Sequence, residues 1–381
     1  MTPGRSARIL IVDDSAVMRS LLRTVVLGSP GLEIAGCAAD GESALAMIRS
    51  ELPDLIVLDV EMPVMDGLVT LTTLRKRGFT MPVIMCSSLT QRGARVTIEA
   101  LAAGASDYVT KPSAQVNREA ALGLLACELI PRIRALTDGA PPEAVRTLQS
   151  RKEVSTTLRA GNLADSESRL SAPAIVVIGV STGGPAALEV LLPGLPVDFP
   201  LPVLVVQHMP ELFTSYLAER LNMSCRLRVR EASAGDVIVP GRIYLAPGNW
   251  HMEVVSGSQS DQKPALHLNQ HPPVNHCRPS VDVLFRSALA VYGSGVIAVV
   301  LTGMGSDGLA ACREICARKG LVLAQDRDTS VVWGMPGAVA NAGLANRVLP
   351  LNLIAPEILR LASSPRPISR SRDVQETVVQ E

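Results

Sequence analysis

The chain has 381 residues, 47% of them hydrophobic, and its 36 basic residues balance its 36 acidic residues. This length exceeds what one ordinary hydrophobic core occupies, so we expect about two domains, and the absence of a basic excess argues against a protein that grips nucleic acid through its phosphates. No apolar run approaches the roughly 20 residues that cross a bilayer, Met1–Arg8 lacks a signal-peptide core, and the 7 scattered cysteines suggest no disulfide framework, so we expect a reduced, cytoplasmic protein without membrane insertion.

The first expected domain, residues 8–136, alternates short apolar segments with segments of helical periodicity. Helical segments such as Ala16–Leu27 and Glu42–Glu51 separate the expected strands. The strands are bounded by polar, Gly or Pro positions and comprise Arg8–Val12, Glu33–Cys37, Leu55–Leu58, Val83–Cys86 and Asp107–Val109. This order predicts a doubly wound parallel sheet with helices on both faces, and such sheets bind ligands at the carboxyl ends of their strands.

Polar side chains follow several of these strands. Asp13 and Asp14 end the first strand, Asp59 ends the third, Ser87 follows the fourth and Lys111 follows the fifth. Three converging carboxylates are costly unless a cation sits among them, and Mg²⁺ suits oxygen ligands. The lysine and the hydroxyl could then bind a phosphate, with an aspartate as the nucleophile. The simpler alternative is that Asp13 and Asp14 only cap the helix that begins near Ser15.

This constellation resembles the receiver domain of response regulators. The resemblance covers residues 8 to about 130 and rests on Val12-Asp13-Asp14-Ser15, Leu58-Asp59-Val60-Glu61-Met62-Pro63, Asp66-Gly67, Ser87 and Lys111-Pro112. It implies that Asp59 accepts phosphate from a histidine kinase and that Mg²⁺ is the cofactor. It further implies Mg²⁺ ligation by Asp13, Asp14 and Asp59, phosphate binding by Lys111, and movement of Ser87 and Tyr108 when the site is filled. Ser87 stands where many receivers have Thr.

Residues 137–171 read as a linker, since Gly139, Pro141 and Pro142 open them and a polar, serine-rich stretch closes them. A second alternating series in residues 172–362 predicts another doubly wound α/β domain, with strands at Ala174–Ile178, Val203–Gln207, Arg242–Leu245, Val296–Leu301 and Leu321–Ala324. Its expected helices are Pro185–Leu192, Glu211–Asn222, Ser280–Tyr292, Gly308–Arg318 and Pro336–Asn341. Met252–Leu268 predicts an inserted hairpin with a loose loop at 257–263, and residues 363–381 predict a disordered tail.

The segment Gly179-Val180-Ser181-Thr182-Gly183 satisfies G-x-S-x-G between an expected strand and helix. This pattern is typical of a serine nucleophile on a sharp turn, whose free amides hold an oxyanion. A glycine-rich turn without catalysis, or a phosphate-binding loop, remains an alternative.

A serine nucleophile needs a base and a carboxylate that orients the base. His208 ends a strand and is better placed than the four other histidines, although a buried core histidine is the alternative. Asp307 lies in the glycine-rich turn Thr302–Gly308 at a helix start, where the helix dipole favours its charged form and where it could also serve only as a cap. The order Ser181, His208, Asp307 differs from that of α/β-hydrolases.

The motif order of the whole chain resembles the chemotaxis protein-glutamate methylesterase family (CheB). A receiver is followed by Gly179–Gly184, Gln207–Pro210, Arg278–Phe285 and Thr302–Gly308. The resemblance implies hydrolysis of glutamyl methyl esters, and deamidation of certain glutamines, on cytoplasmic helices of methyl-accepting chemoreceptors, with a CheA-type histidine kinase as phosphodonor. The implied site consists of Ser181 as nucleophile, His208 as base, Asp307 as its orienter, backbone amides near Thr182 and Gly183 for the oxyanion, and Met304 beside them. No cofactor is implied for the ester chemistry, and Ser306 stands where the family often has Asn.

Two other functions stay open. A serine hydrolase acting on small soluble esters would ignore receptors, and a phosphorylation-dependent binding protein would lack a reactive serine. A DNA-binding regulator is less expected, because residues 172–362 predict α/β structure rather than a compact helical reader.

Overall fold

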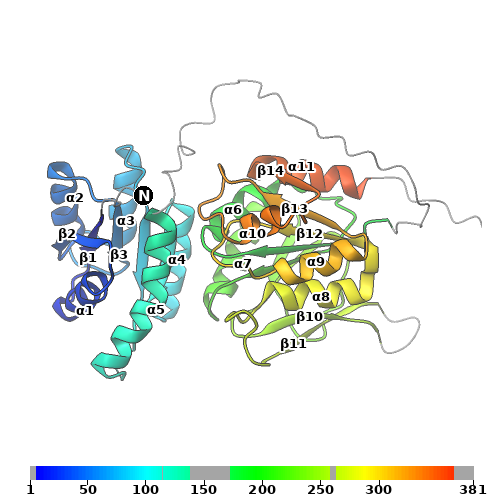
Figure 1. The fold of residues 1–381 in the computed structure, drawn as a ribbon, viewed down its shortest axis with the longest axis horizontal. Helices are drawn as coiled ribbons and strands as arrows, with labels where there is room; N and C mark the ends of the chain where they lie inside the picture. Colours follow the sequence, from blue (N-terminus) through cyan, green and yellow to red (C-terminus); the bar gives the residue numbers. More distant parts are fainter. Residues whose placement is uncertain (1–5, 114, 138–171, 258–262, 364–381) are drawn as a thin grey trace, which may run out of the picture.

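The structure is a computed structural model that describes residues 6–113, 115–137, 172–257 and 263–363. Nearly all of the expected linker and tail, and the centre of the expected loop at 257–263, lie outside these ranges. The described chain forms two α/β units, each built on a parallel sheet (Figure 1). The predicted fold class is confirmed.

The N-terminal unit is a five-stranded sheet in the order β2-β1-β3-β4-β5. Its strands are β1 (Ala7–Val12), β2 (Leu32–Ala38), β3 (Leu55–Asp59), β4 (Val83–Ser87) and β5 (Asp107–Thr110). Its helices are α1 (Ala16–Leu27), α2 (Gly41–Ser50), α3 (Gly67–Lys76), α4 (Gln91–Ala102) and α5 (Arg118–Thr137). All pairings are parallel, so the five carboxyl ends meet at one edge.

Local sequence explains why these helices begin where they do. The Ser15 hydroxyl accepts a hydrogen bond from the amide of Met18 at the start of α1, and Asp66 caps α3 through the amide of Val69. The buried residues of α1 recur along one face, as an amphipathic helix requires: Met18, Leu21, Leu22, Val25 and Val26.

The C-terminal unit is a seven-stranded parallel sheet in the order β14-β13-β12-β6-β7-β9-β8. Its strands are β6 (Ile175–Val180), β7 (Val203–Gln207), β8 (Arg228–Glu231), β9 (Arg242–Leu245), β12 (Val296–Val300), β13 (Leu321–Gln325) and β14 (Arg347–Leu349). Its helices are α6 (Gly184–Leu191), α7 (Phe213–Ser224), α8 (Val281–Tyr292), α9 (Leu309–Ala317), α10 (Met335–Asn341) and α11 (Leu351–Ala362). The hairpin of β10 (His251–Val255) and β11 (Ala265–Asn269) forms a separate two-stranded sheet.

The strand β6 lies at the centre of this unit, and all of its residues are buried. Val176, Ile178 and Val180 pack into the apolar layer with α6, α7 and α11, whereas Ile175 and Val177 pack into the layer with α8, α9 and α10. A continuous apolar run is what a parallel strand covered on both faces requires. From β6 the chain winds one way through β7 and later the other way through β12, β13 and β14, so β6 and β12 flank the switch point where ligands bind in such folds.

The sequence analysis did not name β8, β14 or α11. Both are edge strands of only four and three residues, too short to give a clear apolar pattern. The helix α11 contains Pro356, which argues against a helix interior, yet its apolar face is buried through Ile354 and Ile358.

The two units pack against each other. Helix α4 contacts α6 and α7, and Figure 1 shows α4 and α5 on the side of the N-terminal unit that faces the C-terminal unit. The ring of Tyr108 from β5 stacks on Phe213 at the start of α7, with centroids 4.9 Å apart and planes 15° apart. Within the residues that the structure describes, no helix is long and apolar enough to cross a membrane.

Candidate functional site

Three neighbouring strands bring the expected catalytic segments together. Val180 pairs with Gln207 across β6 and β7, so Ser181 and His208, the next residues, are neighbours at the carboxyl edge. The His208 amide donates to the Val180 carbonyl at 3.1 Å. On the other side, the Ser181 amide donates to the carbonyl of Thr302, just after β12, at 3.0 Å. Segments more than 100 residues apart thus meet at the switch point.

The turn after β6 depends on glycine. Gly183 has φ +77°, and a Cβ there would lie 2.6 Å from the Cβ of Val331. In the described part of the chain, the backbone amides of Thr182 and Gly183 donate to no other residue. Because they precede α6, whose amino end carries partial positive charge, they form a place where an oxyanion would be stabilised.

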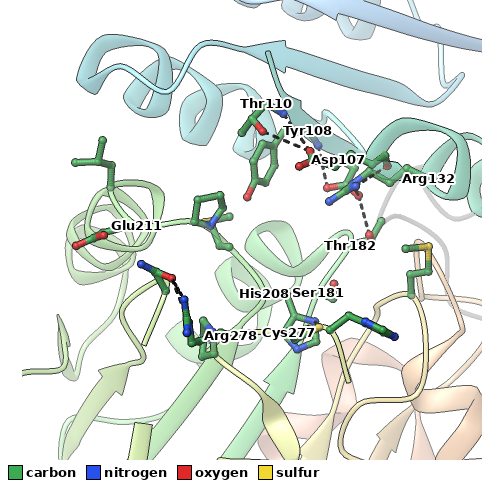
Figure 2. A pocket seen from close by; sticks show the side chains of 18 of the residues that line it. Asp107, Tyr108, Thr110, Arg132, Ser181, Thr182, His208, Glu211, Cys277 and Arg278 are labelled. Carbon is green, nitrogen blue, oxygen red and sulfur yellow. Dashed lines mark hydrogen bonds and ion pairs between the residues drawn. The ribbon is translucent and has the colours of Figure 1, made fainter. Parts of the chain in front are cut away.

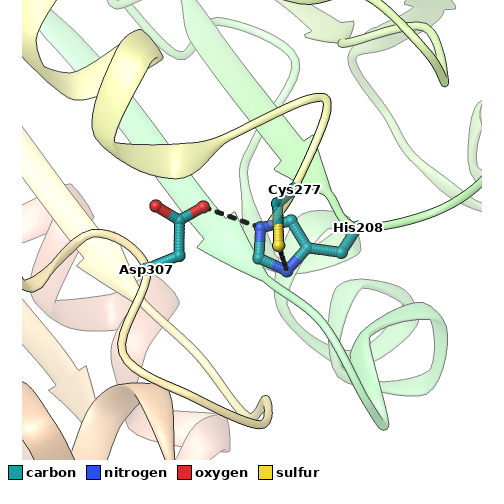
Figure 3. A group of neighbouring side chains, drawn as sticks. All are labelled: His208, Cys277 and Asp307. Carbon is teal, nitrogen blue, oxygen red and sulfur yellow. Dashed lines mark hydrogen bonds and ion pairs between the residues drawn. The ribbon is translucent and has the colours of Figure 1, made fainter. Parts of the chain in front are cut away.

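His208 makes contacts through both ring nitrogens, shown in Figure 3. Its Nε2 lies 2.8 Å from Oδ2 of Asp307, and its Nδ1 lies 3.6 Å from Sγ of Cys277. Burial disfavours the charged imidazolium, but the hydrogen bonds to Asp307 and Cys277 outweigh it and raise the pKa of His208 to about 9. The imidazole therefore holds a proton strongly in this arrangement.

Asp307 is buried and only 3% exposed. Burial alone would raise the pKa of this carboxyl, but His208, Asn275 and the amide of Val281 donate to it and lower the pKa to about 2. Asp307 is thus a fixed anion next to the base.

Ser181 is near His208 without being bonded to it. Among the described residues, no hydrogen bond joins the Ser181 hydroxyl to the imidazole, although both side chains line one cavity. Asp307 occupies Nε2, so Nδ1 is the nitrogen that Ser181 would use, and Cys277 now contacts it. Sequence reasoning considered Cys277 only as a possible metal ligand beside His276 and did not predict its contact with His208.

His208, Cys277 and Asp307 also have the composition of a metal site. The thiol and the carboxylate, however, lie on opposite nitrogens of the imidazole ring. A metal ion binds along one nitrogen lone pair, so it would not reach both partners in this geometry. A relay of hydrogen bonds fits the arrangement better.

The cavity at this site has a volume of about 820 Å³ and is lined by both units (Figure 2). The C-terminal unit supplies Ser181, His208 and Met304, with Cys277 and Arg278 also facing the space. The N-terminal unit supplies Leu89, Asp107, Tyr108, Thr110, Glu128 and Arg132. The N-terminal unit therefore forms a roof over Ser181 and His208.

One hydrogen bond joins this roof to the turn that follows β6. Oδ2 of Asp107 in β5 accepts from the Thr182 hydroxyl at 2.7 Å, and Arg132 in α5 donates to the same oxygen at 3.1 Å (Figure 2). Thr182 directly follows Ser181. A carboxylate of one unit is consequently held beside the place where negative charge would develop in the other.

The expected receiver residues also converge. Asp13, Asp14 and Asp59 place carboxylate oxygens within 4.8 Å of one another, and Lys111 Nζ lies 2.8 Å from Asp13 and 2.7 Å from Asp59. Burial outweighs the lysine contact and raises the pKa of Asp59 to about 6. Oxygen ligands at this spacing, with one exposed aspartate open to solvent, fit Mg²⁺.

Ser87 and Tyr108 lie on the two strands between this acidic cluster and the roof. Ser87 is fully buried at the end of β4, and its carbonyl accepts from the Lys111 amide at 2.8 Å. Tyr108 lies on β5 with its ring against Phe213. Ser87 thus lies between the aspartates and the contact with the C-terminal unit, and Tyr108 is part of that contact.

Comparisons with known proteins give the same division of the chain. Residues 9–122 match the response regulator receiver domain, and residues 176–358 match the CheB methylesterase domain. A protein-glutamate methylesterase/protein-glutamine glutaminase of Trichodesmium erythraeum is 46% identical over 93% of this chain and 98% of the relative. A second such protein, of Caulobacter vibrioides, is 45% identical over 94% of this chain and 99% of the relative. The crystal structure of the Thermotoga maritima CheB methylesterase catalytic domain is 42% identical, covers 50% of this chain and 99% of that chain, and has a TM-score of 0.48.

Proposed function

This chain belongs to the CheB methylesterase family, and we propose that it hydrolyses glutamyl methyl esters, and deamidates certain glutamines, on chemoreceptors. The observation that carries the proposal is the Asp307–His208 pair beside Ser181 at the switch point of the sheet. A buried anion, a base and a hydroxyl at the start of a helix are the parts that acyl transfer needs.

The proposed reaction is covalent acyl transfer. The Ser181 oxygen attacks the ester carbonyl carbon while His208 takes the serine proton at Nδ1. The amides of Thr182 and Gly183 stabilise the negative carbonyl oxygen of the tetrahedral intermediate. His208 then gives the proton to the departing methoxide, which leaves as methanol. Water, deprotonated by the same nitrogen, attacks the acyl-enzyme, releases the glutamate carboxylate and restores Ser181.

The test is methanol release from methylated receptor. A Ser181→Ala variant should lose nearly all turnover, because a triad nucleophile contributes several orders of magnitude. A fluorophosphonate probe should label the wild-type chain at Ser181 and leave the variant unlabelled. A Ser181→Ala variant that keeps the wild-type rate refutes the assignment, and an unlabelled wild type favours a binding protein without chemistry.

We infer further that the receiver controls access to this site. Asp59 would accept phosphate from a CheA-type kinase, and Mg²⁺ held by Asp13, Asp14 and Asp59 would neutralise the phosphate charge. Lys111, which now pairs with both buried aspartates, would move to the phosphate oxygens. Lys111 directly follows β5, which contains Asp107 and Tyr108. A movement of Lys111 towards the phosphate would therefore be transmitted to the roof through this one strand.

Opening would break specific contacts. These are the stack of Tyr108 on Phe213 and the hydrogen bond of Thr182 to Asp107. In the closed arrangement, the Asp107 carboxylate beside Thr182 adds electrostatic repulsion of an oxyanion to the physical cover. Phosphate on Asp59 would shift the population towards the open arrangement.

The control proposal has its own test. A fragment that begins at Ala172 should release methanol without a phosphodonor, at the rate of the phosphorylated whole chain. A folded fragment that stays as slow as the unphosphorylated chain, yet is labelled at Ser181, would refute occlusion while leaving the esterase assignment intact.

A further inference from the structure

The motif Arg278–Phe285 and the preceding Asn275 take no direct part in the proposed acyl transfer. Ser280 is the N-cap of α8 by position, but its side chain makes no capping bond to its own helix. Instead the Ser280 hydroxyl, fully buried, donates to Oδ1 of Asp307 at 2.9 Å. A serine at this position ordinarily accepts from its own helix, so this hydroxyl is used for another purpose.

Asp307 supplies the missing cap of α8 from a different segment. Its Oδ2 accepts from the Val281 amide at 2.7 Å, and its Oδ1 accepts from the Asp282 amide at 3.2 Å. These are the first two amides of α8, where the helix dipole favours a negative charge. The carboxylate that faces His208 is therefore also a structural part of α8.

The arrangement is reciprocal. Oδ1 of Asp282, in the first turn of α8, accepts from the amide of Ala311 in the first turn of α9 at 2.8 Å. Asp307 itself lies directly before Gly308, the N-cap of α9, which has no side chain to offer. Thus α9 is capped by a carboxylate on α8, and α8 is capped by a carboxylate two residues before α9, so the packing of α8 on α9 fixes both carboxylates.

Asn275 joins the two carboxylates. Its Nδ2 donates to Oδ2 of Asp282 at 2.9 Å and to Oδ1 of Asp307 at 2.8 Å. Two carboxylates that are each only 3% exposed would repel each other without a donor between them. The amide relieves this repulsion without adding a charge.

The donors divide between the two oxygens of Asp307. Oδ1 accepts from Asn275, Ser280 and the amides of Asp282 and Gly308, which leaves Oδ2 to the Val281 amide and His208. Rotation of the carboxylate would break several of these bonds at once. The ionisable side chains around the Asp307 carboxylate are His208, His251, Asp282 and Arg286.

We propose that Ser280, Asn275 and the first amides of α8 are positioning residues for the esterase, holding the Asp307 carboxylate so that Oδ2 faces His208 throughout the reaction. This inference rests on the proposed function, in which His208 is the base. None of these groups lines the cavity, so they act through Asp307 rather than on the substrate.

The first experiment compares two serines of the same region in the full chain with a phosphodonor. Ser280→Ala should lower kcat for methanol release by about 10-fold to 100-fold, since it removes a hydrogen bond to a charged group, and should leave KM unchanged. Ser287→Ala is the control, because that hydroxyl lies on α8 and accepts from the Val254 amide at 3.0 Å, away from Asp307. Equal kcat values for both variants would overturn the proposal.

The second experiment does not depend on turnover. The titration of His208 is followed by NMR in the wild type, Asn275→Asp and Asn275→Ala. Asn275→Asp is isosteric but replaces a donor by a third carboxylate, so the midpoint should rise by more than in Asn275→Ala. A folded Asn275→Asp chain with an unmoved His208 midpoint would overturn the proposal. A wild type that releases no methanol would instead sink the proposed function, and the His208 titration would still decide whether these residues position Asp307.

Discussion

The two sheets hold buried carboxylates at their carboxyl edges, but they stabilise them in different ways. In the receiver unit, Asp13 and Asp59 face one cationic side chain, Lys111, and burial still raises the pKa of Asp59 to about 6. In the catalytic unit, burial would raise the pKa of Asp307, but hydrogen bonds from His208, Asn275 and the Val281 amide lower it to about 2, and the Ser280 hydroxyl donates to the same carboxylate. A lysine side chain can shift to a phosphate on Asp59, whereas amides at a helix start stay in place. One site is suited to a change of charge and the other to a constant charge.

Among the following variants, the largest loss of activity should come from removing the negative charge of Asp307. Asp307→Asn should lower kcat/KM for methanol release by about 10³-fold to 10⁴-fold, since the base loses its orienting anion. The measurement is turnover of methylated receptor with a phosphodonor present. A loss below tenfold in a folded variant would mean that Asp307 serves mainly as a cap of α8.

The pH profile of turnover tests the effect of Asp307 on the protonation of His208 without a mutation. His208 must be neutral to accept the serine proton, and its pKa is raised to about 9, so activity should be present above that pH and fall by roughly tenfold per pH unit below it. Turnover is measured from pH 6 to pH 10, with Ser181→Ala subtracted at each pH for spontaneous hydrolysis. A plateau that already begins at pH 7 would show that the imidazolium is not stabilised in the working enzyme.

Contacts between the units should have an intermediate effect. Tyr108→Ala removes the ring stacked on Phe213, so the unphosphorylated chain should release methanol about tenfold faster, as a coupling of 1–3 kcal/mol implies. The phosphorylated chain should change little. Tyr292→Ala is the control for loss of an aromatic ring, because Tyr292 lies at the end of α8 and does not line the cavity. Equal activation of both variants would contradict a role of the Tyr108–Phe213 stack in holding the units together.

The aspartate cluster of the receiver unit predicts that Mg²⁺ stabilises this unit. Mg²⁺ at about ten times its dissociation constant should stabilise the receiver unit by about 1.4 kcal/mol. Calorimetry with and without Mg²⁺ should show this shift in the wild type and a much smaller one in Asp14→Ala, which removes the exposed ligand of the cluster. An equal shift in both would place the ion elsewhere.

The smallest effect should come from Cys277. Its thiol contacts the imidazole at Nδ1, but the proposed acyl transfer assigns it no step. Cys277→Ala should therefore keep turnover within about threefold of wild type, as expected when no transition-state contact is lost. A drop as large as that of Ser181→Ala would make Cys277 the nucleophile.

Much of the fold was predictable because parallel strands covered on both faces appear in the sequence as short, continuous apolar runs. Val203–Gln207 and Arg242–Leu245 have the predicted bounds, and the hairpin after Trp250 is present. The short edge strands β8 and β14 carried too few apolar residues to be named. Helix boundaries shifted by one or two residues, as capping often causes.

The candidate site was only partly predictable. Strand-end positions place Ser181, His208 and Asp307 on one edge, and the structure brings Asp307 onto His208, although the catalytic roles remain predictions. The contact of Cys277 with the imidazole and that of Asp107 with Thr182 join segments far apart in the chain. No local pattern encodes such pairs, because they depend on how loops and whole units pack.

The size of the cavity between the receiver unit and Ser181 determines which molecules can reach Ser181 in the closed arrangement. An α-helix with its side chains is about 10–12 Å wide, so two turns occupy roughly 1,000 Å³, more than the 820 Å³ of the cavity between the two units. A compact reagent of a few atoms fits where a helical substrate does not. The unphosphorylated enzyme should therefore admit small reagents and exclude helical partners, so that labelling by a small probe reports a reachable Ser181 while receptor turnover reports whether the two units have separated.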